Sequence, residues 1–192
     1  MIYKKIPYKS GLQILNRFKA TDEAVELINE DMSVSETIDA LKASDLNFDL
    51  VQLLAHGLPV RESIWWASLC LDIRQNEWSP IQQQCIDTAR QWVKSPSEEL
   101  RRKSELFANR LEQNCGPSWL AQAVFWNGSG SIVAADLPAV LPDPNLYAKA
   151  VSGSVNHAAA LPQWEGTEKY YQQSFAMAVD IATGGNGKEV EA

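Results

Sequence analysis

The sequence predicts an all-α domain, and three observations lead to that prediction. Apolar residues recur at helical spacing along most of the chain, helix-capping residues precede these runs, and no alternating strand pattern occurs. At 192 residues the chain is long enough for one well-buried core. We therefore expect a single domain of about eight or nine helices arranged in antiparallel pairs.

The chain opens with a basic segment. Residues 1–20 carry five lysines and arginines and no acid, so their local charge is +5. Residues 22–49 follow with nine acids against a single lysine. We expect residues 1–20 to form a basic arm that folds back on this acidic stretch through weak, salt-screened contacts.

Three short helices are predicted next. The first, 21–29, opens with a Thr-Asp pair that can cap it. The second, 33–43, opens with Ser33 and Glu36 at the spacing of a capping box. The third, 47–57, starts at an asparagine that can serve as its N-cap and ends at a glycine.

The most apolar helix is predicted at 58–73, where the sequence reads LPVRESIWWASLCLDI and Pro59 takes the first helical position. A helix that is apolar all round must be surrounded by other elements, so this one belongs at the centre. Trp65 and Trp66 cannot point the same way, and we expect Trp66 in the core. Arg61 is expected to stack on Trp65 or to pair with an acid of a neighbouring helix, a structural role.

Two further helices are predicted by repeated Ser-Pro signals. The first, 79–94, has apolar residues at helical spacing, and the second, 95–114, has a narrower apolar stripe. We expect the charged residues of the second helix to lie outside that stripe, in solvent; they are Glu98, Arg101, Arg102, Lys103 and Glu105.

The last part of the chain alternates helices with irregular segments. A Gly-Pro pair opens a helix at 116–126, and a proline-rich stretch at 131–144 predicts an extended connector. The helix at 143–161 is rich in small residues, which would let a neighbouring helix approach closely. A final helix is expected over 166–182. The predicted organisation is thus the basic arm at 1–20, a helical domain at 21–183 and a disordered tail at 184–192.

Nothing in the sequence forms a recognisable catalytic or metal-binding pattern, and we expect no cofactor. Cys70, Cys85 and Cys115 show no CxxC spacing and are expected to be free buried thiols. His56, at the end of its helix, is expected as an imidazolium that interacts with the helix C-terminus. His157 is expected as a packing or surface residue, with acid-base catalysis as the alternative.

Charge and aromatic residues suggest where a partner would bind. Surplus acid repels nucleic acid and anionic membranes and favours a basic protein. No apolar run is long enough to cross a bilayer and no secretory signal is evident, so we expect a cytoplasmic protein. The partner-binding candidates are Glu23, Glu26, Glu30, Asp31, Trp126 and Asn127. The alternative is that the acids are solvated outer faces of helices and that Trp126 belongs to the core.

Three stretches carry a resemblance to a known family: LPVRESIWWASLCL, ARQWVKSPSEELRR and SWLAQAVFWNGSGSI. They resemble a family of uncharacterised proteins from Gram-negative bacteria, over roughly residues 55 to 160. Members are encoded near type VI secretion spike and effector genes. The resemblance implies a non-enzymatic adaptor or chaperone that helps to load an effector onto the spike. It is equally compatible with an immunity protein that neutralises a toxin, and a small hydrolase or transferase is a further alternative.

Overall fold

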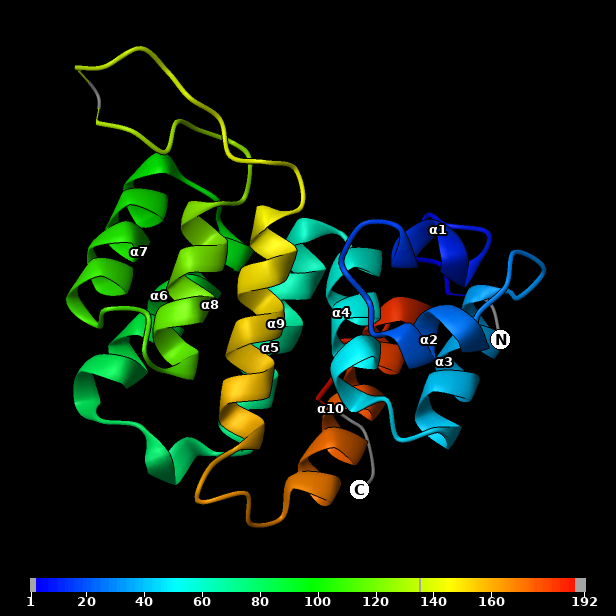
Figure 1. Ribbon diagram of the computed structural model, residues 1–192. Helices are drawn as coiled ribbons and strands as arrows, with labels where there is room; N and C mark the ends of the chain where they lie inside the picture. Colours follow the sequence, from blue (N-terminus) through cyan, green and yellow to red (C-terminus); the bar gives the residue numbers. More distant parts are fainter. Residues whose placement is uncertain (1–2, 135, 189–192) are drawn as a thin grey trace.

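A computed structural model of the protein describes residues 3–134 and 136–188, and all regular structure within them is helical (Figure 1). The prediction of an all-α domain is confirmed. The elements of the described chain are α1 (Gly11–Leu15), α2 (Asp22–Leu27), α3 (Val34–Ala43), α4 (Asn47–Gly57), α5 (Val60–Asp72), the 3-10 helix η1 (Gln75–Glu77), α6 (Pro80–Lys94), α7 (Glu98–Arg110), α8 (Gly116–Phe125), α9 (Leu146–Ala159) and α10 (Thr167–Thr183).

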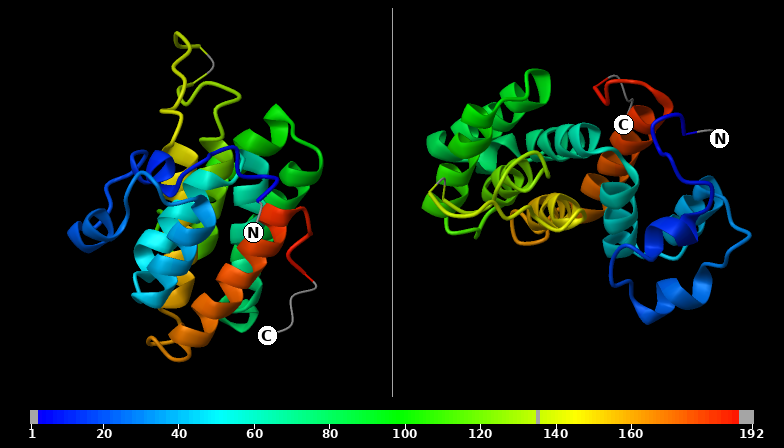
Figure 2. Two further views of the ribbon diagram at one scale, coloured as in Figure 1. Left: turned by 90° about the vertical axis from the view of Figure 1, so that its right-hand side faces the viewer. Right: turned by 90° about the horizontal axis from the view of Figure 1, so that it is seen from above.

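The helices are arranged around a central pair, α5 and α9. The helices α6, α7 and α8 lie on one side of this pair, and α4 with α1, α2 and α3 lies on the other (Figures 1 and 2). The last helix, α10, packs on α5 and also contacts α4 and α9. The apolar helix predicted at 58–73 therefore lies at the centre of the molecule, as its lack of a polar face requires.

Trp66 is the core residue of the central helix α5. Its side chain is fully buried, and its Nε1–H donates a hydrogen bond of 2.8 Å to the carbonyl oxygen of Ser174 on α10. Trp65 is only half-buried and points elsewhere, as expected for adjacent helical positions. The indole of Trp66 thus fills the space between α5 and α10 and joins the two helices through a buried polar contact.

Small residues allow α8 and α9 to approach closely. A Cβ atom on Gly153 would lie 3.2 Å from the ring of Trp119 on α8, and one on Gly116 would lie 3.2 Å from the carbonyl oxygen of Ser154 on α9 and 2.8 Å from Leu71 on α5. The hydroxyl of Ser154 donates to the carbonyl oxygen of Gly116 at 2.8 Å. The prediction that the small residues of 143–161 admit a close neighbour is confirmed, and the neighbour is α8.

Several helix starts differ from the predictions. The Ser33 capping box is present, but Asn47 lies within α4 behind Leu46, and Pro59 occupies the N-cap position of α5. The helix predicted from Ser95 begins at Glu98, because the Ser97 hydroxyl accepts from the Leu100 amide at 3.2 Å. Residues before a proline are disfavoured in helical geometry, which moves the cap past the Ser-Pro pair.

The N-terminal segment does not behave as a salt-screened arm. Ile6, Ile14 and Leu15 are buried in the core, and the Lys5 amide donates to the carbonyl oxygen of Ala182 at 2.9 Å. The five-residue helix α1, which was not predicted, packs on α3 and α4. Apolar burial, rather than attraction between the basic and acidic segments, therefore holds this part of the chain.

The start of the predicted disordered tail is ordered. The amide of Gly187 donates to Asp180 Oδ2 at 2.7 Å, and the carbonyl oxygen of Asn186 accepts from Trp65 Nε1 at 2.8 Å. Gly184 and Gly187 have φ angles of 113° and 74°, which favour glycine. The glycines of this segment thus let the chain turn back onto α5, and residues 189–192 of the predicted tail lie outside the described residues.

Replacing Trp66 by alanine should lower the free energy of unfolding by about 3 to 5 kcal/mol, because it leaves a large cavity between α5 and α10 and removes the bond to Ser174. Chemical denaturation of the purified protein measures the loss. Trp164→Ala is the matched control, because that side chain is 59% exposed and its loss should cost less than about 0.5 kcal/mol. Equal effects of the two changes would contradict a central role for Trp66.

Candidate functional site

The protonation state of His56 differs from the expected one. Its side chain is buried, with Nδ1 2.9 Å from the carbonyl oxygen of Gln52 and its ring packed on Phe18 at 5.1 Å between centroids. Burial lowers the pKa of His56 to about 4, and the charge of Arg17 lowers it further in the same direction. The imidazole is therefore neutral at physiological pH, and the predicted imidazolium at the helix end is wrong.

The second histidine and the three cysteines also lie in positions where they serve packing or hydrogen bonding. His157 Nε2 lies 3.0 Å from the carbonyl oxygen of Asn114. The three cysteines are free and buried as predicted, and burial raises the pKa of Cys70 and of Cys85 to about 12, so both stay as unreactive thiols. Within residues 3–134 and 136–188, no group of three or more His, Cys, Asp or Glu side chains gathers to hold a metal ion.

The acidic stretch forms a solvent-exposed surface. Glu23 and Glu26 lie on α2, and Glu30 and Asp31 lie in the turn that leads to α3. None of these four acids forms a salt bridge with another described residue. We call these four residues the acidic surface. The structure leaves them available to a partner and does not pair them with the basic N-terminal segment.

One acid of this stretch has a structural role instead. Asp49 is buried, and its carboxylate accepts hydrogen bonds from the amide and the hydroxyl of Thr21 at 2.9 and 2.8 Å. Thr21 is in turn the N-cap of α2, because its Oγ1 accepts from the Ala24 amide at 3.2 Å. Asp49 therefore fixes the start of α2, which carries part of the acidic surface, and does not contribute to that surface itself.

A buried arginine holds the segment that follows α8. Arg101 is fully buried, contrary to the expectation that it lies in solvent, and it pairs with both carboxylate oxygens of Glu98 at 2.6 and 2.7 Å. The same guanidinium donates to the carbonyl oxygens of Phe125 at 3.0 Å and Ser131 at 2.9 Å. A Cβ on Gly130 would lie 2.8 Å from it. Two charge-assisted hydrogen bonds thus tie α7 to the end of α8 and to the connector, and the two to Glu98 hold the guanidinium in place.

Arg102 adds one further hydrogen bond to the connector and two ion pairs on its own helix, and we call Arg101 and Arg102 with these contacts the anchor. Arg102 donates to the carbonyl oxygen of Val133 at 3.0 Å and to the carboxylates of Glu98 and Glu105, each at 3.0 Å. The guanidinium carbons of Arg101 and Arg102 lie 5.0 and 5.6 Å from the centroid of the Phe125 ring. Hydrogen bonds from the two arginines lower the pKa of Glu98, so this carboxylate stays charged in the anchor.

Trp126 and Asn127 lie at the base of the connector. Trp126 is half-buried and packs against the main core. The side-chain amide of Asn127 donates to the carbonyl oxygen of Val124 at 2.6 Å and accepts from the amide of Ser129 at 2.9 Å. Asn127 thus shapes the turn after α8, and contact of either residue with a partner stays a prediction.

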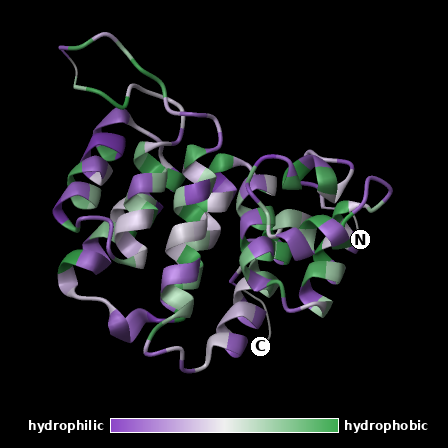
Figure 3. Cartoon of the chain, viewed as in Figure 1, coloured by the Kyte–Doolittle hydropathy of each residue, from purple (hydrophilic) through white to green (hydrophobic). Residues whose placement is uncertain are grey.

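The connector itself stands away from the helices (Figure 1). We call residues 131–134 and 136–144 the connector projection. Its base is closed by the bond from the Ile132 amide to the carbonyl oxygen of Val140 at 2.8 Å, and Ser131 Oγ accepts from the Val140 amide at 3.1 Å. The projection carries exposed apolar side chains, Leu137 at 55%, Val140 at 48% and Leu141 at 65%. Stretches of hydrophobic colour run along it in Figure 3. The projection therefore offers apolar groups to solvent from an anchored, extended backbone.

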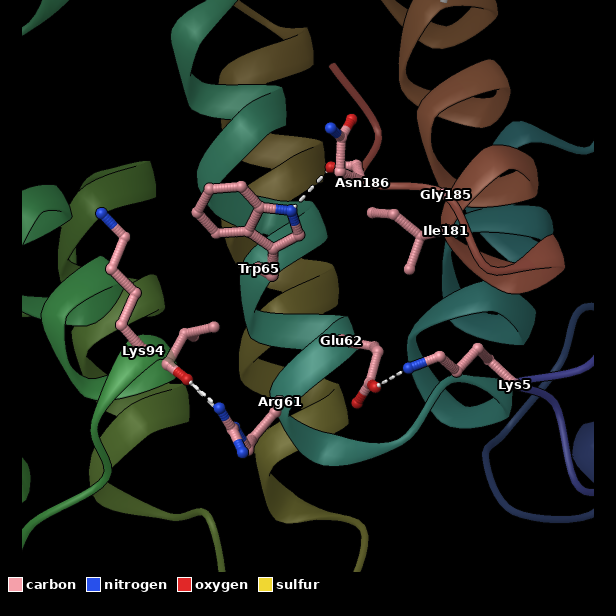
Figure 4. Close-up of a pocket in the computed structure, with 9 residues that line it drawn as sticks. Lys5, Arg61, Glu62, Trp65, Lys94, Ile181, Gly185 and Asn186 are labelled. Carbon is pink, nitrogen blue, oxygen red and sulfur yellow. Dashed lines mark hydrogen bonds and ion pairs between the residues drawn. The ribbon is translucent and has the colours of Figure 1, made fainter. Parts of the chain in front are cut away.

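Arg61 and Trp65 meet around a hollow on the surface of α5 (Figure 4). In place of the expected stacking or ion pair, the Arg61 Nε donates to the carbonyl oxygen of Val93 at 3.0 Å, in the last turn of α6. Trp65 contacts the segment after α10 through Asn186. Both residues therefore hydrogen-bond to neighbouring elements of the fold.

The structure does not bring the predicted partner-binding residues together. The acidic surface lies on α2 and the turn after it, whereas Trp126 and Asn127 lie at the end of α8, on the other side of the central helices (Figure 1). The anchor of Arg101 and Arg102 was missed because alternating charges on a helix usually indicate a solvated face. The Glu98 spacing to both arginines was visible, but the carbonyl oxygens that they bind carry no sequence signal.

Comparison with known proteins gives one family. Residues 37–182 match a family described as a family of unknown function (DUF6931). No curated protein and no solved structure matches the chain. In the part of the chain that the structure describes, no helix combines the length and the hydropathy needed to cross a membrane.

Replacing Arg101 by methionine should lower the free energy of unfolding by about 3 kcal/mol, because the carbonyl oxygens of Phe125 and Ser131 lose a charged donor. It should also speed proteolytic cleavage of the connector projection under native conditions. Denaturation and limited proteolysis measure the two effects. The exposed Arg110→Met serves as the control; if it matched Arg101→Met in both assays, the anchor would not hold the projection.

His56 should make stability depend on pH. The unfolded chain takes up a proton at this residue near pH 6.5, whereas the folded protein does so only near pH 4, so protonation favours unfolding between these values. The free energy of unfolding should fall by about 3 kcal/mol as the pH drops through this window, and His56 should cause no further loss below it. The difference between wild type and His56→Gln, measured by denaturation at each pH, isolates this contribution. A difference that does not change from pH 7 to 4 would refute it.

Proposed function

We propose that this protein, which belongs to the DUF6931 family of unknown function, binds another protein through its connector projection and is not an enzyme. The observation that supports the proposal is the exposure of Leu137, Val140 and Leu141 on a segment that two arginines fasten at its base. Apolar groups that stay in solvent on an ordered backbone are typical of a binding segment.

The energetics favour this use of the projection. Burial of an exposed aliphatic side chain contributes about 1.5 to 3 kcal/mol, so three of them can supply the centre of an interface. An extended segment that is anchored before binding loses less conformational entropy on association. The hydrogen bonds from Arg101 and Arg102 to Ser131 and Val133 provide that anchoring.

The acidic surface supports a second part of the proposal, that the partner carries positive charge near its binding face. Exposed acids raise the rate of encounter with a basic protein more than they raise affinity. They also disfavour nucleic acid and anionic membranes as partners.

The favoured biological role is that of an adaptor or chaperone that helps to load an effector in a bacterial type VI secretion system, and we place it in the cytoplasm. This role depends on the resemblance of residues 55–160. The acidic surface favours a second candidate, an immunity protein whose acids cover a basic toxin. The identity of the recovered partner distinguishes the two candidates. An adaptor should recover a secretion component with its cargo, and an immunity protein should recover a toxin that is inactivated on binding.

Replacing Leu137 and Leu141 together by aspartate should reduce partner recovery at least about tenfold, because charged groups would replace the apolar centre of the contact. Affinity capture from the native host, followed by measurement of binding to the recovered partner, tests this. The control is Leu106→Asp on α7, a side chain 68% exposed outside the projection, which should leave recovery unchanged. If the double substitution left partner recovery unchanged, the connector projection would not be the binding segment. If the wild type recovered no partner and a small molecule were turned over, the protein would be an enzyme.

The acidic surface is tested with the same partner. Reversing Glu23, Glu26 and Glu30 to lysine should slow association about tenfold at low salt and weaken its dependence on salt, with little change in dissociation. Stopped-flow or surface-based kinetics measure both rates. An association rate that is unchanged at low salt would mean that these acids are only a solvated face.

A further inference from the structure

A hollow of about 480 Å³ opens on the surface beside the half-buried Trp65 (Figure 4). The first turn of α5 supplies Arg61 and Glu62, and the last turn of α6 supplies Lys94. The far side is closed by Ile181 of α10 and by Asn186 of the segment after it, and both lie across the hollow from Lys94. Its size is that of a pocket for a few side chains.

Positive charge gathers at this pocket on a chain whose net charge is −7. Lys5, Arg61 and Lys94 line it, and Lys188 Nζ lies 5.3 Å from the centroid of the Trp65 ring. The acid among the described lining residues is Glu62, and Lys5 already neutralises it at 2.7 Å. The balance of charge within the pocket therefore favours an anionic ligand, in contrast to the net negative charge of the chain.

Two of these cations keep donors for a ligand. Arg61 uses Nε and one terminal nitrogen on the carbonyl oxygen of Val93, which leaves its other terminal nitrogen unused by that contact. Lys94 forms no salt bridge with any residue of 3–134 or 136–188. The N–H of Trp65 is occupied by Asn186, so the indole contributes an apolar surface rather than a donor.

We infer that this pocket binds an acidic segment of a partner protein, with a carboxylate held by Lys94 and Arg61 and a neighbouring apolar side chain packed on Trp65. The combination of cations with an indole suits a peptide that alternates acidic and apolar residues. Nucleic acid fits less well, because the net negative charge of the chain repels an extended polyanion while a short peptide meets mainly the local field.

A hollow of similar size near α10 has fewer of these features. It is lined by Asp72, Arg74 and Lys169, and Arg74 already donates to the carbonyl oxygens of Ala158 and Glu165. The pocket at Trp65 has one more cation against a single acid, and it adds an indole, which the residues lining the other hollow do not supply. None of the described residues of the connector projection lines it, so this inference goes beyond the proposed function and does not depend on it.

The test uses a fluorescein-labelled, capped octapeptide of alternating glutamate and leucine and measures its polarisation on the full-length protein. A glutamine–leucine peptide of the same length is the neutral counterpart, and it should bind at least about tenfold more weakly. Lys94→Glu should weaken binding of the acidic peptide at least about tenfold, while the exposed Lys103→Glu on α7 changes net charge equally and should have little effect. Added salt should weaken the acidic peptide selectively.

A second measurement determines where on the protein the peptide binds. In a ¹⁵N correlation spectrum, the indole N–H resonance that disappears in Trp65→Phe should shift on titration in the wild type, and thermal melting verifies that each variant is folded. The inference is overturned if the neutral peptide binds equally, or if Lys94→Glu and Lys103→Glu have the same effect. It is also overturned if the Trp65 resonance does not move, or if inorganic phosphate displaces the peptide at equal concentration, because the pocket would then take small anions.

Discussion

The close contact between α8 and α9 is the constraint on which the rest of the structure depends. Gly116, Gly153 and Ser154 let the two backbones approach, and larger residues there would meet Leu71 or Trp119. Because α9 also packs on α5 and α4, this approach sets the position of both sides of the molecule relative to the centre. The connector between α8 and α9 is then free to leave the surface, since neither helix needs it for packing.

Arginines at the ends of neighbouring helices provide the second organising feature. Helices leave their last carbonyl oxygens without intrahelical partners, and a guanidinium from another element can satisfy them. Arg61 does this for α6, Arg74 for α9 and Arg101 for α8. Each contact joins two helices as well as capping one. The same type of interaction thus holds the fold together, shapes the Trp65 pocket and anchors the connector projection.

The sequence predicted the features that depend on local pattern and missed those that depend on tertiary contacts. The Ser33 capping box, the helix at 79–94 and the central position of Trp66 follow from spacing and hydropathy, and the structure contains all three. The burial of Arg101 and the neutral state of His56 depend on neighbours distant in sequence or supplied by the fold. The helix α1 was missed because five residues carry too little periodicity.

The same distinction applies to the candidate sites. Charge alone predicted the acids of α2 as partner-binding candidates, and this stays a prediction, as does the structural role predicted for Arg61 and Trp65. Their pocket could not be predicted, because Lys5, Lys94 and the segment after α10 reach it from separate parts of the chain. The apolar side chains of the connector were visible in the sequence, but their exposure depends on the way in which Arg101 and Arg102 hold its base.

The hydrogen bond between the Lys5 amide and the carbonyl oxygen of Ala182 has a consequence for biosynthesis. These residues lie almost the whole length of the described chain apart, and the ribosome makes Lys5 long before Ala182. Tyr3 and Lys5 must therefore wait for their α10 neighbours while most of the helices are synthesised, whereas Ile6 can pack beside Gly57 of α4 much earlier. The closing of this contact is a late, non-local step, so the first residues of the chain take their final place only after α10 has emerged from the ribosome.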